Sequence, residues 1–303
     1  MKFFYYLPGR WVPLNTELVT GSAYRRLVQT AERVGFYGAC LDEHPAPVAS
    51  WLHGGGGHHS LDPMVTLAMF AGATTRLRLL TYLAILPARN PFLFAKAATS
   101  LDVMSEGRLI LGVGTGYMPG EFAALGVDFE KRNELFSEAI EIFRKACSGE
   151  AVTYSGVGFC AEEVIIQPVP VQKPHPPLWL GGNAKLTLRR VAEFGQGWLP
   201  MLRRQGTGSL HKTPFLEGYE DLKEMMAYMF EHANKVGRRA PIDVVISGAM
   251  LGAGSLDEQA GNIEKFRALG VTGFVVSGER ASIEEEEEFL EIYADRVIQH
   301  AAE

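Results

Sequence analysis

The feature that most constrains the fold of this 303-residue chain is a regular alternation of apolar runs of strand length with segments of helical periodicity. In the longer segments, apolar side chains recur every three or four positions. Near-continuous apolar strands are typical of parallel sheets, which helices cover on both faces. Eight strand–helix pairs in one chain predict a (β/α)8 barrel. The predicted strands are Lys2–Leu7, Tyr37–Leu41, Leu77–Leu86, Arg108–Val113, Leu178–Leu180, Gly197–Leu199, Ile242–Ser247 and Gly273–Ser277.

An open, doubly wound sheet is the alternative architecture. Such sheets bind dinucleotides at a glycine-rich turn after the first strand, and the first strand here is followed by Pro8 without a G-x-G-x-x-G sequence. The barrel is therefore favoured. Neither an internal repeat nor a linker breaks the pattern, so we expect a single domain over residues 1–303. Residues 45–60, 150–176 and 201–215 are expected to be insertions after strands two, four and six, at the end of the barrel where active sites lie.

Charge and cysteine content argue against several classes of protein. The chain has 29 Lys and Arg against 35 Asp and Glu, a net charge of −6, which argues against nucleic-acid binding through bulk charge. No run reaches the roughly 18 apolar residues of a membrane span, and the first residues read as a strand, not as a signal peptide. Three cysteines do not make a disulfide framework. We expect a cytoplasmic protein without a nucleic-acid or membrane partner.

Candidate acid/base groups follow the second predicted strand. In barrels the chemistry lies just after the C-terminal ends of strands, and Asp42, Glu43 and His44 occupy that position. Carboxylates beside an imidazole can exchange protons with a substrate. We therefore predict His44 and Glu43 as catalytic residues. The alternative is that the acids are solvated and that His44 is an ordinary loop residue.

The next loop contains Trp51, three histidines and four consecutive glycines. Histidines beside Glu43 can ligate a metal, but no second ligand set at a suitable spacing completes the coordination. Consecutive glycines suit a closing lid better than a rigid ligand frame. We predict no metal site, and a metal-dependent barrel hydrolase that uses His53, His58, His59 and Glu43 stays open as an alternative.

Glycine-rich segments follow the fourth and fifth strands. The first, Gly112–Tyr117, allows close approach of a flat or anionic ligand, although glycine at a strand end is also ordinary turn chemistry. The second, Gly181–Lys185, leads straight into a helix, whose free amides can bind an anion. Ser277–Arg280 after strand eight competes for this role, because barrels often bind phosphate near their last strands.

The chain resembles the luciferase-like monooxygenase superfamily, and within it the branch of deazaflavin-dependent oxidoreductases. The resemblance runs from the first strand to about residue 200 and depends on the order and spacing of its segments. These segments are Leu41–Pro47, Leu86–Pro91, Leu101–Leu109, Leu111–Tyr117, Pro174–Asn183 and Gly195–Pro200.

The resemblance implies a bacterial-luciferase-like barrel that binds FMN or the deazaflavin coenzyme F420 at its mouth, with the choice open. It implies that His44 lies near the reactive edge of the flavin, and it favours strands four and five over strand eight as the phosphate site. A non-proline cis peptide is expected near Tyr82-Leu83, under the ring. Luciferase has an arginine in place of Thr115 and a reactive cysteine in place of Gly114. The expected cofactor-binding residues are Tyr82, Leu83, Gly114, Thr115, Gly116, Tyr117, Gly181, Gly182 and Asn183.

The activity that follows is oxidation or oxygenation of a small apolar or aromatic organic substrate, in a pocket with Trp51, His58 and Trp198. With FMN a separate flavin reductase is an expected partner, and with F420 a hydride passes to or from the substrate. The resemblance also implies a homodimer through helices near strands two and three, with Leu67 and Phe70 as candidates. A basic cluster of Arg203, Arg204, His211 and Lys212 could meet an acidic tail or substrate. A flavin-binding barrel without turnover is the alternative in another class.

Overall fold

The computed structural model describes residues 1–9, 17–54, 57–204 and 213–302. Eight parallel strands close into a barrel in the order β1-β10-β9-β8-β7-β4-β3-β2, and helices alternate with them along the chain, which confirms the (β/α)8 prediction. Each strand lies within one residue, at either end, of its predicted run. The strands are β1 (Lys2–Tyr6), β2 (Gly38–Leu41), β3 (Arg78–Ile85), β4 (Leu109–Gly114), β7 (Leu178–Gly181), β8 (Gly197–Leu199), β9 (Asp243–Ser247) and β10 (Gly273–Val276).

The helices begin and end where local sequence signals predict. The side chains of Asp62 and Asn90 each accept hydrogen bonds from two amides of the first turn, and a proline opens each helix. Gly35 ends the first helix with φ 98°, a left-handed conformation that glycine adopts readily. The long helices are α1 (Gly21–Val34), α3 (Pro63–Ala73), α4 (Pro91–Met104), α6 (Arg132–Ala146), α7 (Lys185–Glu193), α8 (Tyr219–Lys235), α9 (Leu256–Leu269) and α10 (Ile283–Tyr293).

The chain divides into two compact units, each described here by itself. The first comprises Met1–Cys40, Arg76–Arg78 and Leu178–Glu303, and the second comprises Leu41–Thr75 and Leu79–Pro177. The strands of the barrel are drawn from both units. The assignment of residues 1–303 to a single domain stays a prediction.

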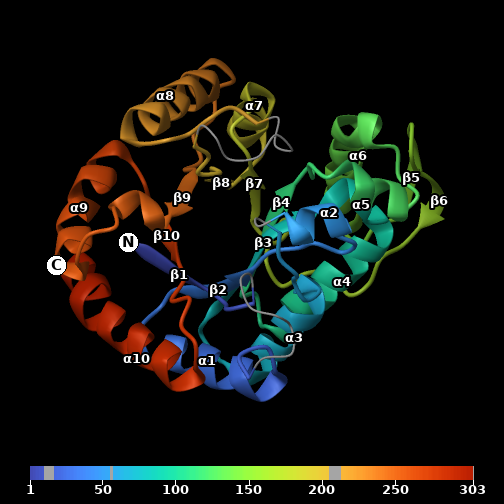
Figure 1. The fold of residues 1–303 in the computed structure, drawn as a ribbon. Helices are drawn as coiled ribbons and strands as arrows, with labels where there is room; N and C mark the ends of the chain where they lie inside the picture. Colours follow the sequence, from blue (N-terminus) through green and yellow to red (C-terminus); the bar gives the residue numbers. More distant parts are fainter. Residues whose placement is uncertain (10–16, 55–56, 205–212, 303) are drawn as a thin grey trace. The chain divides into compact units, whose positions relative to one another are not determined.

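In the first unit, α1 packs beside α10 and α7 beside α8 (Figure 1). Glu286 of α10 is buried, and its carboxylate accepts hydrogen bonds from the Tyr5 hydroxyl at 2.8 Å and from the Arg280 amide at 2.9 Å. Burial raises the pKa of both the Glu286 carboxyl and the Tyr5 hydroxyl. Glu286 is therefore a buried link between β1 and α10.

In the second unit, α4 packs against α3 and α6, and a hairpin of β5 (Val152–Ser155) and β6 (Cys160–Val164) lies against α6 (Figure 1). The buried Glu138 carboxylate on α6 accepts hydrogen bonds from the Val157 and Gly158 amides in the hairpin turn. This side chain therefore fixes the hairpin to the helix.

The position predicted for the insertion at residues 150–176 is wrong. The segment follows α6 and precedes β7, so it belongs to a helix-to-strand connection and not to the connection after strand four. Connections of this kind lie at the end of a barrel that contributes stability, not chemistry. The insertion after strand two contains a short helix, α2 (Ala49–His53), and the insertion after strand six includes residues 205–212, which lie outside the described part.

Among the described residues, no helix combines the length and the apolar composition that crossing a membrane requires.

Candidate active site

His44 is held between a carboxylate and a phenol in the second unit. Its Nδ1 lies 3.1 Å from Oε1 of Glu121, and its Nε2 lies 3.2 Å from the hydroxyl oxygen of Tyr117. Its backbone amide donates to the Ser60 hydroxyl at 2.7 Å. The exposed fraction is 8% for His44 and 1% for Glu121. The imidazole therefore has both ring nitrogens in defined contacts and little contact with water.

The Glu121 carboxylate determines which tautomer of His44 is favoured. A carboxylate only accepts hydrogen bonds, so Nδ1 is the nitrogen that carries the proton in the neutral ring. Nε2 then holds the lone pair and accepts from Tyr117. Glu121 belongs to α5 (Pro119–Ala124), which begins shortly after β4. The geometry thus provides a proton acceptor of fixed orientation at the end of β2.

Asp42, Trp51 and His58 surround the same imidazole. His58 Nε2 lies 2.6 Å from Oδ2 of Asp42, and its ring meets that of His44 edge to face with centroids 4.9 Å apart. The Trp51 ring lies 4.5 Å from His44 and 5.0 Å from His58, centroid to centroid. The structure therefore brings together two of the predicted pocket residues, Trp51 and His58, with the predicted catalytic histidine.

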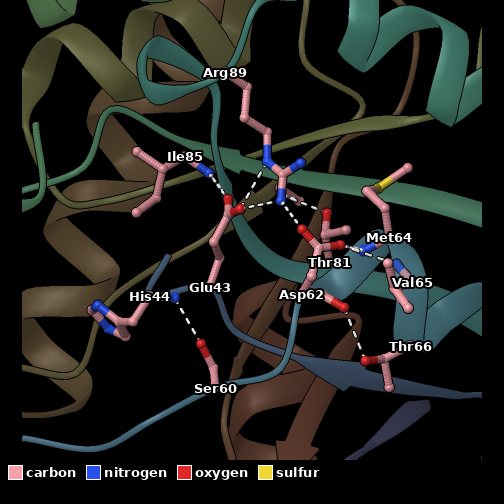
Figure 2. Close-up of polar contacts among 11 residues, drawn as sticks. Glu43, His44, Ser60, Asp62, Met64, Val65, Thr66, Thr81, Ile85 and Arg89 are labelled. Carbon is pink, nitrogen blue, oxygen red and sulfur yellow. Dashed lines mark hydrogen bonds and ion pairs between the residues drawn. The ribbon is translucent and has the colours of Figure 1, made fainter. Parts of the chain in front are cut away.

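Glu43 does not orient His44, although the two are neighbours in sequence. Its carboxylate accepts from the Ile85 amide at 2.6 Å and from Arg89 Nε at 2.7 Å, and Arg89 also pairs with Asp62 at 2.7 Å. Figure 2 shows the carboxylate directed at Arg89 and the ring of His44 lying away from it. Burial raises the pKa of the Glu43 carboxyl, against the opposing charge of Arg89. The role of Glu43 in this geometry is to tie the end of β2 to the segment after β3 and to the start of α3.

The predicted cofactor segments at β3 and β4 contact each other. The Tyr82–Leu83 peptide is cis, as the resemblance implies. A Cβ atom on Gly114 would lie 3.0 Å from Cδ1 of Leu83, and a Cβ on Gly116, whose φ is 72°, would lie 2.7 Å from the Phe122 ring. Close packing and a positive φ thus require glycine at Gly116, whereas a Cβ on Gly114 would need only a small shift of the Leu83 side-chain end. Thr115 and Tyr117 are half-buried beside them.

The glycine segment after β7 lies beside two threonine hydroxyl groups in the first unit. Gly182 has φ 113°, and the nearest atoms to a Cβ placed there are the hydroxyl oxygens of Thr187 at 3.7 Å and Thr213 at 4.0 Å. Gly181 is half-buried next to it. Hydroxyl groups beside the start of α7 suit a phosphate group.

Asn183 and Trp198 hold this segment in place. Asn183 is buried, and its side-chain amide donates to the carbonyls of Met201 and Pro214 at 2.7 and 2.9 Å and accepts from the Met201 amide at 2.8 Å. The Trp198 indole is 0% exposed and donates to the Gly182 carbonyl at 2.9 Å. Direct contact of these two side chains with cofactor or substrate stays a prediction.

The basic cluster expected near residues 203–212 is described only in part. Arg203 donates to the Thr213 carbonyl, and its guanidinium lies 4.4 Å from the centre of the Phe215 ring. Arg204 is exposed, and His211 and Lys212 lie outside the described residues. Arg203 therefore packs within its own loop.

The ligand set considered for a metal hydrolase is not the set that the structure gathers. His53 and His59 are exposed, and Glu43 bonds to Arg89. Within the described part of the chain, the group whose ligand atoms lie close enough for one ion is Asp42, His44 and His58.

The sequence alone assigns no role to Glu121 or Arg89. Glu121 lies in the first turn of a short helix, where an acid is explained by the helix dipole alone. Its contact with His44 spans 77 positions, and the contact of Arg89 with Glu43 spans 46. The one local signal is position, because both residues follow strand ends of the barrel closely.

Comparisons with known proteins agree with the fold. A family model described as luciferase-like monooxygenase matches residues 1–267. The crystal structure of the monooxygenase RslO1 from Streptomyces bottropensis superposes with a TM-score of 0.83 at 21% identity, over 99% of this chain and 100% of that one. The FMN complex of the oxygenating constituent of 3,6-diketocamphane monooxygenase from Pseudomonas putida superposes with a TM-score of 0.77 at 15% identity, over 99% and 98% of the two chains.

Matches to curated sequences are shorter. The F420-dependent hydroxymycolic acid dehydrogenase of Mycobacterium tuberculosis is 29% identical over 178 residues, which are 58% of this chain and 48% of that protein. The chain spans half or less of the length of such relatives, down to 38% of an uncharacterised Sinorhizobium fredii protein. The family model nevertheless covers most of the chain, and the chain belongs to the luciferase-like monooxygenase family.

Proposed function

We propose that this protein is a flavin- or deazaflavin-dependent oxidoreductase that acts on a small apolar or aromatic organic substrate. The observation that carries the proposal is the His44 imidazole, oriented by Glu121 and Tyr117 in a barrel of the luciferase-like family. Half-buried aromatic rings of Trp51 and Tyr117 beside it suit an apolar or aromatic molecule.

FMN and coenzyme F420 are the two cofactors proposed. The FMN complex among the similar structures supports the first, and the F420-dependent relative supports the second. The segment at Gly182, with the Thr187 and Thr213 hydroxyls beside it at the start of α7, suits the phosphate that both cofactors carry. When bound, either one supplies the redox chemistry.

The residues of the chain supply orientation and proton transfer. Glu121 keeps the proton on Nδ1 of His44, so that Nε2 can accept a proton from the substrate and return it. The Tyr117 hydroxyl, which lies 3.2 Å from Nε2 in this structure, can instead hydrogen-bond a substrate oxygen. Trp51 offers a flat apolar face beside the imidazole. If FMN is the cofactor, a separate flavin reductase is the proposed partner that delivers it in the reduced form.

The test begins with the purified protein and the two cofactors. Fluorescence titration measures the affinity for FMN and F420. Turnover is then measured with the cofactor that binds, on a panel of alcohols, aldehydes and aromatic compounds. Replacing His44 with alanine is expected to lower kcat by about 10²–10⁴-fold, with cofactor affinity nearly unchanged. Failure of both cofactors to bind would contradict the proposal. Tight binding with no turnover on any compound would favour the non-catalytic barrel.

We also propose a homodimer through α3 and α4, and a cytoplasmic location. Leu67 and Phe70 are fully buried within their own chain, so the contact would use their exposed neighbours Val65 and Leu93, each 72% exposed. The location is supported by the cysteines, all three of which are free thiols.

A further inference from the structure

We propose that Asp42, His44 and His58 form a binding site for a divalent transition-metal ion, with Zn²⁺ as the best fit, and that the bound ion inhibits turnover by occupying His44. Binding of the ion stands on the geometry alone. Its inhibitory effect rests on the proposed function of His44.

The three side chains offer one ligand atom each, and these atoms all lie within 4.8 Å of one another. Protein ligands bind Zn²⁺ at about 2.0–2.2 Å in a tetrahedral arrangement, so the side chains would rotate to place all three ligand atoms around one ion. His58 Nε2 and Asp42 Oδ2 are already 2.6 Å apart and would separate slightly to admit it. A fourth position is left for water or substrate.

The choice of ion follows from the donor atoms. Two imidazole nitrogens and one carboxylate oxygen suit Zn²⁺ and its transition-metal neighbours, whereas Mg²⁺ and Ca²⁺ prefer oxygen ligands throughout. Both histidines are buried and Asp42 is half-buried, which limits competition from water. Arg89, the cation next to Glu43, is already paired with two carboxylates.

The surroundings of His44 have the arrangement that metal-binding histidines require. A ligating imidazole usually donates its second N–H to a carboxylate, which fixes the tautomer and strengthens the ligand. Glu121 is placed to accept from Nδ1 of His44 at 3.1 Å. Nε2 is then the nitrogen that faces the ion, and the Tyr117 hydroxyl would give up its contact with that nitrogen.

The occupied site would prevent proton transfer at His44. A lone pair that is bound to Zn²⁺ cannot accept a proton from substrate. The same imidazole would therefore be available either to the metal or to the reaction. The protein would then lose activity reversibly as the free zinc concentration rises.

The binding test uses protein that has been treated with a chelator and then freed of it. Calorimetric titration with Zn²⁺ is expected to give one ion per chain, and Co²⁺ is expected to give the intense visible absorption of a tetrahedral site. Loss of an outer-shell partner already weakens metal binding by about 10–100-fold, so replacing the ligand His58 with alanine should cost more than about 100-fold. His59→Ala is the matched control, because His59 is the exposed neighbour of His58, and it should bind as the parent protein does.

The results separate the two parts of the proposal. Unchanged Zn²⁺ affinity in folded His58→Ala protein, or an equal loss in His59→Ala, would overturn the site. With cofactor and substrate present, the ratio of rates with and without Zn²⁺ should fall steeply for the parent protein and much less for His58→Ala. Binding at these residues without any loss of rate would overturn the inhibition. Absence of turnover under all conditions would contradict the proposed function, and calorimetry would still decide whether the site exists.

Discussion

At the scale of single residues, two glutamates near His44 have opposite relations to it. Glu43 is its neighbour in sequence but bonds to Arg89, whereas Glu121 is far away in sequence and meets the imidazole directly. Local sequence could identify His44, because a strand end in a barrel is a known place for chemistry. It could not identify Glu121, because which carboxylate reaches the imidazole depends on a contact between residues 77 positions apart in sequence.

Replacing Glu121 with glutamine is expected to lower kcat by about 10–100-fold, since a hydrogen bond to a charged group contributes about 1.5–3 kcal/mol. KM and cofactor affinity should change little, because Glu121 acts through His44. Glu121→Asp should recover part of the rate. Steady-state kinetics check this, with exposed Glu130→Gln as the control, and a rise in KM at constant kcat would argue against a positioning role.

Arg89→Met is expected to destabilise the protein by about 2–4 kcal/mol, because it leaves the buried Glu43 carboxylate without its countercharge. The double variant Glu43→Gln/Arg89→Met should be more stable than Arg89→Met alone, because no buried charge is then left unpaired. Urea unfolding measures both. If the double variant loses as much free energy of unfolding as Glu43→Gln and Arg89→Met lose together, Glu43 is not stabilised by Arg89.

At the scale of helices and strands, apolar runs and capping residues predicted the positions of the elements. Asp62 and Asn90 cap the starts of α3 and α4 with their side chains. Gly35, which has no side chain, ends α1 in a left-handed conformation. The insertion at residues 150–176, which contains the hairpin β5–β6, was assigned to the wrong connection. A Pro-rich sequence marks an interruption but does not show at which end of the barrel the interruption lies. The decisive fact is that α6 already completes the connection after β4.

His175, just before β7, should make stability depend on pH. It is buried against the Phe143 ring and the Pro176 carbonyl, and burial lowers its pKa. The folded state therefore keeps the ring neutral at pH values where the unfolded chain, with an ordinary pKa of about 6.5, takes up a proton. The free energy of unfolding is therefore not reduced by His175 above a pH of about 6.5, and it decreases as the pH falls below that value.

His175→Gln is accordingly expected to flatten the loss of stability between about pH 7 and pH 5. Urea midpoints at several pH values measure the slope, and exposed His59→Gln serves as the control. An identical slope in His175→Gln and the parent protein would show that the ring contributes nothing to the acid sensitivity.

At the scale of the whole molecule, alternation of apolar runs was enough to predict a barrel, because eight buried strands separated by helices leave few other architectures. The activity could not be read at that scale, since one barrel supports many reactions through its strand ends. The environment of His44 narrows the range of reactions to be considered, and its residues come from separate parts of the second unit.

The proposed dimer predicts a change of mass in solution. Lysine at both Val65 and Leu93 would place charges in an apolar contact and should convert the dimer to monomer without unfolding, because both side chains are exposed in the single chain. Light scattering after size-exclusion chromatography measures the mass, and circular dichroism checks the fold. A dimer that persists in the double variant would mean that α3 and α4 do not form the contact.

The Arg89 network described above also bears on how relatives of this protein could diverge. One guanidinium joins Glu43 and Asp62, and Glu43 in turn holds the Ile85 amide. A substitution at any of these points would disturb three backbone segments at once, so the backbone next to His44 has little freedom to change shape. New substrate preferences would then arise mainly at Trp51, whose ring lies against that of His44 without a hydrogen bond to it in the described part of the chain.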